Sequence, residues 1–281
     1  MRYNHSSLRK DKRAVSPAIS TVILTAAGIV LILVAMNYAN GSLNTQMAAN
    51  EFSTNKQFML TTGLQIDDIA WTIGRTQTIT YSSKFGFLSY NESALSYEFQ
   101  VHTSSLGWVN FTASATGIVQ YKIPIRSYSL GNNYFERVPV SSNGSFLQSG
   151  SSAPVSQVFC EEKKSNNTSS YSRIVLVPTI RVLNSTITGA QPISYFKFYL
   201  PYLKTGGTTF ASSPSITVTG QNVTKITETG VSQVIITAIP NLNSGFDASF
   251  FNFNNVSVSL NIPNSIVEFY FGQVQVIEGH V

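Results

Sequence analysis

The residues from Ala18 to Met36 are the feature that most limits how this chain can fold. They read AISTVILTAAGIVLILVAM, a run of 19 residues without a charged side chain. A helix of about 20 apolar residues is long enough to cross a hydrocarbon layer of roughly 30 Å. The sequence therefore predicts a transmembrane helix over residues 18–36.

The positive charge of the chain lies ahead of this run. Residues 1–14 hold five Lys and Arg against one Asp, which leaves 13 basic and 12 acidic residues in the rest of the 281-residue chain. Because basic flanks stay on the cytoplasmic side, we expect a cytoplasmic N-terminus and an extracellular C-terminal part. No Lys/Arg cluster interleaved with aromatic residues is evident in the later sequence, so the basic pI does not indicate a nucleic-acid partner.

The junction between the basic segment and the helix carries a family resemblance. Residues 12–17 read KRAVSP and lead directly into the apolar run. This arrangement resembles the class III signal peptide of archaeal type IV pilins, in which two basic residues and a Gly or Ala precede the cleavage site. The resemblance covers roughly residues 9–39 and implies that residues 1–14 are a leader. The processing residues would be Lys12, Arg13, Ala14 and Val15, with cleavage between the last two by a membrane prepilin peptidase.

The resemblance also implies partners and a place of action. A pilus assembly ATPase and its membrane platform would lift the mature helix into a filament core shared with other pilin subunits. Bacterial pilins carry Glu at the fifth mature position, where this chain has Ile19. Archaeal pilin-like chains often lack that Glu, so the difference argues against a bacterial pilin. The size of the C-terminal part favours a minor pilin or an adhesin, with a surface or glycan ligand that the sequence does not identify.

Two alternatives remain open at this point. The first is an uncleaved signal anchor that tethers a monomeric β-domain binding protein to the cell surface. The second, weaker alternative is a membrane-tethered hydrolase. The mature N-terminus separates the first alternative from a pilin, because only the pilin would begin at Val15.

Small residues recur along one side of the predicted membrane helix. When an apolar helix leaves lipid for a helical bundle, little hydrophobic energy is gained, so close packing decides association. Small side chains let neighbouring backbones approach, although they are also frequent in membrane helices generally. The candidate packing residues are Thr21, Thr25, Gly28 and Ala35.

The next segment continues the helix pattern. An apolar stripe at helical spacing predicts that residues 15–75 form one N-terminal helix, with a break near Asn40-Gly41, whose outer half docks on the following domain. The stripe comprises Phe52, Met59, Ile66, Ala70 and Ile73. Asp67 and Asp68 are adjacent and point about 100° apart on a helix. They are expected to be a solvated or first-turn pair and not a catalytic dyad.

From Thr76 onward, apolar residues tend to recur at every second position. Tyr97, Phe99 and Val101 alternate with polar residues, and similar runs follow at 119–125, 196–200, 256–262 and 266–277, with a bulge near Asn254-Asn255. Such alternation is typical of half-buried antiparallel strands. We therefore expect an α+β chain in which residues 76–281 form an all-β, antiparallel, β-sandwich-like extracellular domain of about a dozen strands. Residues 143–168 are expected to be an exposed loop, with a solvated charge run at 161–164.

The sequence predicts glycosylation and no catalysis. Acceptor motifs Asn-x-Ser/Thr beyond the leader occur at Asn40, Asn91, Asn110, Asn143, Asn166, Asn167, Asn184, Asn222 and Asn255. No catalytic motif, cofactor motif or metal-ligand spacing is recognisable, and the three His residues are far apart in the sequence. Cys160 is the single cysteine of the sequence, so it should form no internal disulfide. Two Glu residues follow it directly, so its pKa should not be lowered.

Overall fold

A computed structural model describes residues 17–112, 115–138, 145–163, 170–187, 193–241 and 257–280. The chain divides into two compact units, residues 1–47 and 48–281, and each is described by itself. The first unit contains the beginning of the long helix α1, and the second contains the rest of α1 and the strands. A long apolar helix followed by a mostly β domain confirms the coarse expectation from the sequence.

Helix α1 spans Pro17–Ala70 without interruption. The predicted break at Asn40-Gly41 is wrong, because a single Gly costs a helix only about 1 kcal/mol relative to Ala. The Thr45 hydroxyl donates to the Gly41 carbonyl one turn earlier. The helical hydrogen-bond pattern therefore continues through the position.

The helix ends five residues before the predicted boundary. The Thr72 amide donates to the Ile69 carbonyl in a tight turn, and Gly74 then adopts a φ of 81°, a conformation that a glycine reaches without steric cost. Gly74 also donates to the Gly220 carbonyl, which ties the turn to the sheet. Ile73, the last member of the predicted stripe, lies beyond the helix and is exposed, whereas the other four members are buried.

Twelve strands are present among the described residues, as the sequence predicted, and the first begins at Thr76. They are β1 (Thr76–Thr80), β2 (Phe87–Thr103), β3 (Gly107–Thr112), β4 (Thr116–Pro124), β5 (Phe135–Val138), β6 (Leu147–Ser149), β7 (Ser156–Lys163), β8 (Tyr171–Pro178), β9 (Ile180–Ile187), β10 (Ile193–Phe210), β11 (Ser215–Pro240) and β12 (Ser257–His280). Tyr97, Phe99 and Val101 are all buried on β2, as their alternation predicted. The predicted bulge near Asn254-Asn255 lies outside the described residues.

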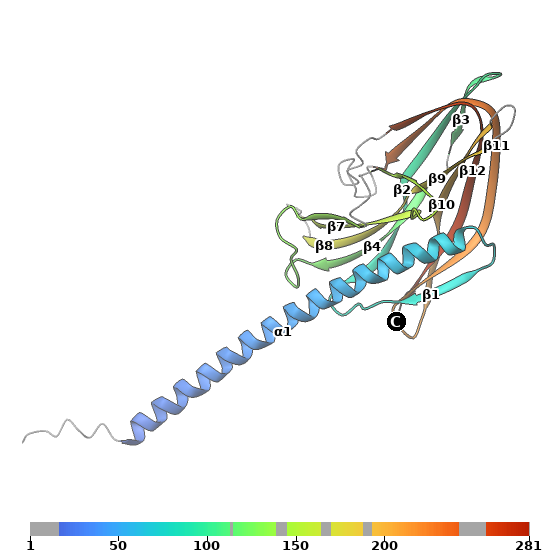
Figure 1. Ribbon diagram of the computed structural model, residues 1–281. Coiled ribbons are helices and arrows are strands. Elements are labelled where there is room, and N and C mark those ends of the chain that lie inside the picture. The colour runs from blue at the N-terminus through green and yellow to red at the C-terminus, as the bar shows by residue number, and fades with distance from the viewer. Residues whose placement is uncertain are drawn as a thin grey trace, which may run out of the picture. The chain divides into compact units, whose positions relative to one another are not determined.

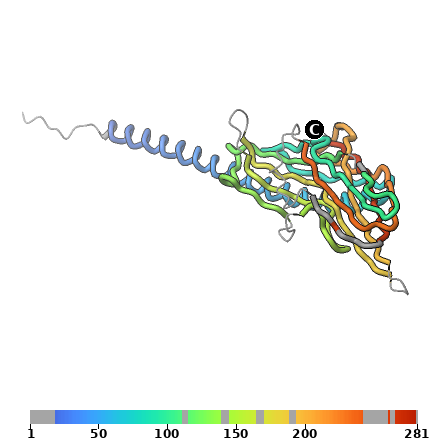
Figure 2. The backbone as a smooth tube through the Cα atoms, turned by 90° about the horizontal axis from the view of Figure 1, so that it is seen from above, coloured from blue at the N-terminus to red at the C-terminus, as the bar shows by residue number. Residues whose placement is uncertain are grey.

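The strands form one hydrogen-bonded sheet in the order β5-β7-β8-β4-β2-β11-β12-β10-β9-β6, with β1 paired to β11 and β3 paired to β2 (Figure 1). Figure 2 shows the strong twist of its long strands. The expectation of a purely antiparallel sheet is wrong, since β10 pairs with β12 and β6 pairs with β9 in parallel. The β10–β12 pair is parallel because β12 inserts between β10 and β11, which run in opposite directions. All twelve strands belong to one hydrogen-bonded sheet, so the expected sandwich of two separate sheets is not confirmed.

Two apolar clusters form the core of the second unit. One lies on one face of the sheet and draws side chains from both halves of the strand order, including Val175 of β8 and Phe269 of β12. The other lies between the opposite face and α1, and includes Phe52, Met59 and Ile66 of the helix. The docking of residues 52–70 of α1 on the β domain is thus as predicted.

The predicted loop at residues 143–168 is wrong over the part that is described. Residues 145–163 contain β6 and β7, and Val158, Phe159 and Cys160 are buried. The two Glu residues of the charge run are not simply solvated: Glu161 pairs with Arg173, and Glu162 accepts hydrogen bonds from the Ser129 hydroxyl and the Gly131 amide. Lys164 lies outside the described residues. The abundant Ser and Asn residues around this segment concealed a short apolar alternation that forms a strand.

Candidate functional site

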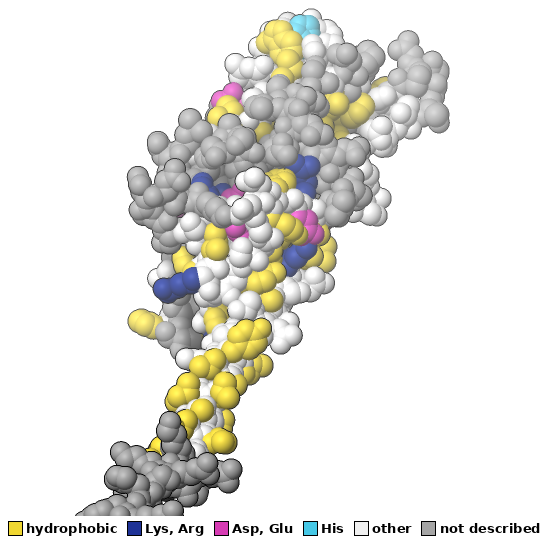
Figure 3. Space-filling view, turned by 90° about the vertical axis from the view of Figure 1, so that its left-hand side faces the viewer, with side chains coloured by type: hydrophobic (Ala, Val, Ile, Leu, Met, Phe, Trp, Pro, Cys, Tyr) yellow, Lys and Arg dark blue, Asp and Glu magenta, His cyan; other side chains and the backbone are white. Residues whose placement is uncertain are grey.

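The exposed apolar surface of α1 in the first unit is the candidate functional site. Its large side chains are exposed on all sides; Leu24, for example, is 76% exposed. Figure 3 shows many of these hydrophobic side chains in yellow along the helix. Among the described residues, α1 is the one helix long and apolar enough to span a membrane, a property shared by membrane anchors and signal sequences. A surface of this kind needs lipid or protein to cover it.

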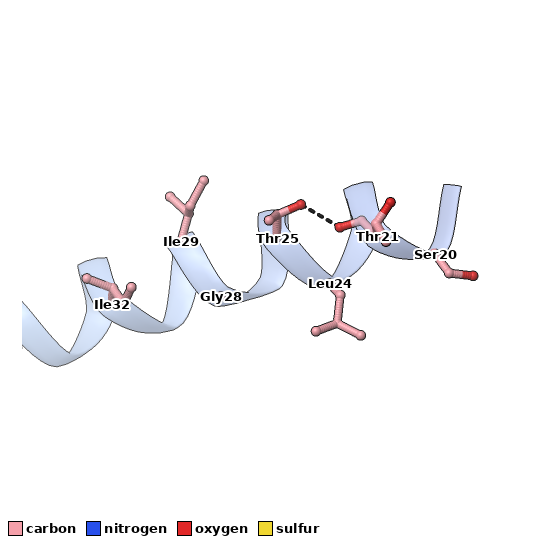
Figure 4. Close-up of a pocket in the computed structure, with 7 residues that line it drawn as sticks. All are labelled: Ser20, Thr21, Leu24, Thr25, Gly28, Ile29 and Ile32. Atoms are coloured by element: carbon pink, nitrogen blue, oxygen red, sulfur yellow. Dashed lines mark hydrogen bonds between the residues drawn. The ribbon is translucent and has the colours of Figure 1, made fainter. Parts of the chain in front are cut away.

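The predicted packing residues lie together on this helix. Thr21, Thr25 and Gly28 line one shallow depression, which Figure 4 shows with the neighbouring side chains that complete it: Ser20, Leu24, Ile29 and Ile32. Ala35 is exposed but does not line the depression. Three of the four predicted residues are therefore brought together at one place.

The polar groups of the depression suit an apolar environment. The Thr25 hydroxyl donates to the backbone carbonyls of Thr21 and Val22 within the same helix. Such internal bonds satisfy a hydroxyl that lipid would otherwise leave without a partner. A Cβ added at Gly28 would meet no atom within 4 Å, so the chain's own fold does not require a glycine there. The depression is open space on an apolar helix.

In the second unit, a buried carboxylate fixes the helix to the sheet. Glu51 is only 5% exposed and accepts backbone N–H bonds from Lys84, Phe85 and Gly86 at 3.1, 2.9 and 3.1 Å. The Tyr121 hydroxyl of β4 donates to the same carboxylate. The segment that enters β2 is thereby held against the helix.

Sequence reasoning missed Glu51, although a signal was present. It is the first charged residue after Arg13 in the chain. A lone acidic residue at the end of a long uncharged helix segment indicates a group with a specific partner, since charges are rarely buried unpaired.

Ion pairs extend this attachment along the helix. Lys56 contacts Glu136 of β5 at 2.6 Å, and Asp67 accepts from Arg181 of β9 at 2.9 Å. Asp67 also accepts from the Trp71 indole, while Asp68 pairs with Arg75. The first-turn alternative is wrong, because both residues lie near the C-terminal end of α1. Asp68 is exposed, as expected for a solvated residue, whereas Asp67 is partly buried between its partners.

The predicted processing and modification residues are only partly described. The leader, including Lys12, Arg13, Ala14 and Val15, lies outside the described residues, as do Asn143, Asn166, Asn167 and Asn255. Among the other sequons, Asn91 is half-buried on β2. The exposed ones are Asn40 on α1, Asn110 on β3, Asn184 on β9 and Asn222 on β11. Glycosylation of these positions stays a prediction.

The pKa of the Cys160 thiol is not lowered, as its sequence context predicts, and burial is the main reason. Cys160 is buried in β7, and burial raises its pKa to about 12, while the charge of Lys56 lowers the pKa and that of Glu136 raises it by smaller amounts. A thiol that stays protonated is a poor nucleophile. Within the described ranges, no group of three or more His, Cys, Asp or Glu is placed to hold a metal ion.

Comparisons with known proteins provide no relative for this chain. No protein-family model, no curated protein sequence and no solved structure matches it.

Proposed function

We propose that this chain is an archaeal type IV pilin-like subunit, either a minor pilin or an adhesin. Prepilin peptidase removes residues 1–14, and an assembly ATPase with its membrane platform moves the remaining helix from the bilayer into a filament. The β domain then forms part of the exterior surface.

One observation carries this proposal. The described helix segment from Ile19 to Met47 leaves its apolar side chains exposed, and it holds the depression over Gly28. A lipid anchor would explain the apolar surface alone, because lipid tails cover any apolar helix equally well. A depression in which Thr21, Thr25 and Gly28 lie between larger apolar side chains adds a place where a second helix can approach closely.

The test is the mature N-terminus together with the location of the protein. We expect the native protein to begin at Val15 and to be found in purified surface appendages. Replacing both Lys12 and Arg13 with Glu should leave the leader attached and remove the protein from appendages, since the basic pair precedes the cleavage site. A native protein that keeps Met1 and occurs only as single copies in the membrane would instead support the tethered binding protein.

A further inference from the structure

A row of charged and aromatic side chains crosses five neighbouring strands at one end of the sheet. Phe87 of β2 faces Lys122 of β4, which faces Arg173 of β8, and Arg173 faces Glu161 of β7. Glu161 in turn faces Phe135 of β5. We name these five residues the basic-aromatic row. Strands lie about 4.8 Å apart, so the row is close to 20 Å long.

The row lies on the face of the sheet opposite to α1. Strand side chains alternate between faces, and the alternate positions Tyr121, Ile174 and Cys160 belong to the cluster under the helix. Further basic and aromatic residues form the next cross-strand pairs on the same face as the row. Arg137 faces Phe159, and Lys163 faces Tyr171.

Positive charge exceeds negative charge on this face. Among the described residues of these five strands, this face carries one carboxylate, Glu161, which pairs with Arg173. The cations on the same face are Lys122, Lys163, Arg137 and Arg173. Arg173 is only 2% exposed, so its charge is buried rather than solvated. Residues 15–281 as a whole hold 13 basic and 12 acidic residues, so this excess is local. An anion placed here would relieve the repulsion between these cations.

Lys122 is the centre of the excess. Its ammonium group lies 5.2 Å from the centre of the Tyr171 ring and 5.9 Å from that of Phe87. Burial, followed by the charges of Arg173 and Lys163, lowers the Lys122 pKa. In the part of the chain that the structure describes, no carboxylate forms an ion pair with it. Aromatic rings hold the ammonium in place while leaving its hydrogen-bond donors available.

We propose that the basic-aromatic row binds an anionic polysaccharide, whose carboxylate or sulfate groups contact Lys122. The rings at the two ends of the row are accessible, with Phe87 54% exposed and Phe135 37% exposed. Their faces supply apolar contact for the C–H surfaces of sugar rings, while Lys122, which is only partly buried, binds the acidic groups. The row thus combines the two kinds of contact that an acidic sugar chain requires.

A second copy of this chain fits the row less well. Only 13 of its 281 residues are acidic, and several of those that are described already pair with Lys or Arg. The choice of a polysaccharide over nucleic acid rests on the exterior position of the β domain under the proposed function. The binding experiment needs neither cleavage nor assembly, so its failure would be distinct from failure of that function.

The test is binding of the full chain, in detergent, to immobilised dextran sulfate, polygalacturonate, uncharged dextran, poly-L-glutamate and a DNA oligonucleotide. We expect binding to at least one of the two acidic polysaccharides, weakening with added salt, and none to uncharged dextran. Lys122→Gln should weaken binding about tenfold, the size expected for one charge-assisted hydrogen bond. Lys122→Arg keeps the charge and should restore most of the affinity.

The matched control is Lys225→Gln on β11. Lys225 also lies over a tyrosine ring, 5.5 Å from the centre of Tyr270, but it pairs with Glu268, away from the row. We expect no change in affinity, and unchanged thermal unfolding of each variant would show that the fold is intact. Equal binding by the parent chain and Lys122→Gln, preference for poly-L-glutamate or an oligonucleotide, or no binding to either acidic polysaccharide would overturn the proposal.

Discussion

At the scale of single residues, two buried charged side chains of the second unit, Arg173 and Glu51, have several local partners. Arg173 and Glu51 are almost fully buried, and each has charged or multiple hydrogen-bond partners. Breaking a buried network is costly because the remaining partners lose both water and their bond. These residues therefore contribute more to the position of the helix and strands than their small number suggests.

Glu51→Gln tests how much a buried charged residue stabilises the fold, at a side chain that accepts from three backbone N–H groups. One carboxylate oxygen accepts from Phe85 and Gly86 and the other accepts from Lys84, so the NH2 group of Gln would face at least one backbone N–H donor in place of an acceptor. We expect a loss of about 2–4 kcal/mol in the free energy of unfolding, measured by urea denaturation. Glu98→Gln, at an exposed position of β2, is the control and should change stability by less than about 0.5 kcal/mol. Equal stability of the two variants would contradict the assigned role of Glu51.

At the scale of elements, α1 has two different surfaces along one continuous helix. Residues 52–70 bury an apolar stripe and polar contacts against strands of their own unit. The segment before residue 48 buries almost none of its side chains within the chain. One helix thus provides both an attachment and a free apolar surface.

Gly28→Leu tests the free surface. Because an added Cβ meets no atom at this position, we expect unchanged folding and unchanged leader cleavage. A neighbouring helix would lose its close approach, at a cost of about 1.4 kcal/mol or more for each contact, and filament yield should fall at least about tenfold. Yield is measured by electron microscopy and by immunoblotting of sheared appendages.

The control for that experiment is Ala26→Leu, about 160° around the helix from Gly28. It adds the same bulk on the other side of α1 and should leave yield nearly unchanged. Loss of filaments in Ala26→Leu alone, or in neither variant, would show that the Gly28 depression is not the packing surface.

The elements could be predicted from the sequence where a pattern is local. The alternation in β2 and the helical stripe from Phe52 to Ala70 each depend on neighbouring residues, and both were found correctly. The insertion of β12 beside β10 and the basic-aromatic row depend on register between segments far apart in sequence. No cluster of Lys and Arg was visible in the sequence because Lys122 and Arg173 become neighbours only when β4 pairs with β8.

At the scale of the whole molecule, acid should weaken the attachment of α1 to the sheet. Burial opposes ionisation of Glu136, but hydrogen bonds from Lys56 and Tyr134 outweigh it, so the Glu136 pKa lies below its ordinary value of 4.5. A carboxylate with a lowered pKa stabilises the fold above its unfolded pKa and loses that contribution as the pH falls through the folded value. The stabilisation is thus complete at neutral pH and declines below about pH 4.5.

The melting temperature of Glu136→Gln, measured from pH 7 to pH 3, checks this. The variant should melt below the parent chain at pH 7, and the difference should shrink as the pH falls, because the parent then loses the same ion pair. For Glu98→Gln, we expect a small difference that stays nearly constant. A constant difference for Glu136→Gln across the whole range would show that the pair adds no pH-dependent stability.

The place of β12 in the sheet has a consequence for biosynthesis. This strand follows the other described strands in the chain, yet it pairs with both β10 and β11. Until a ribosome has passed residue 280, those two long strands present open backbone edges that invite aggregation. A nascent chain stalled before residue 257 would therefore expose two apolar strands at once, and completion of the fold has to wait for translation of its final strand.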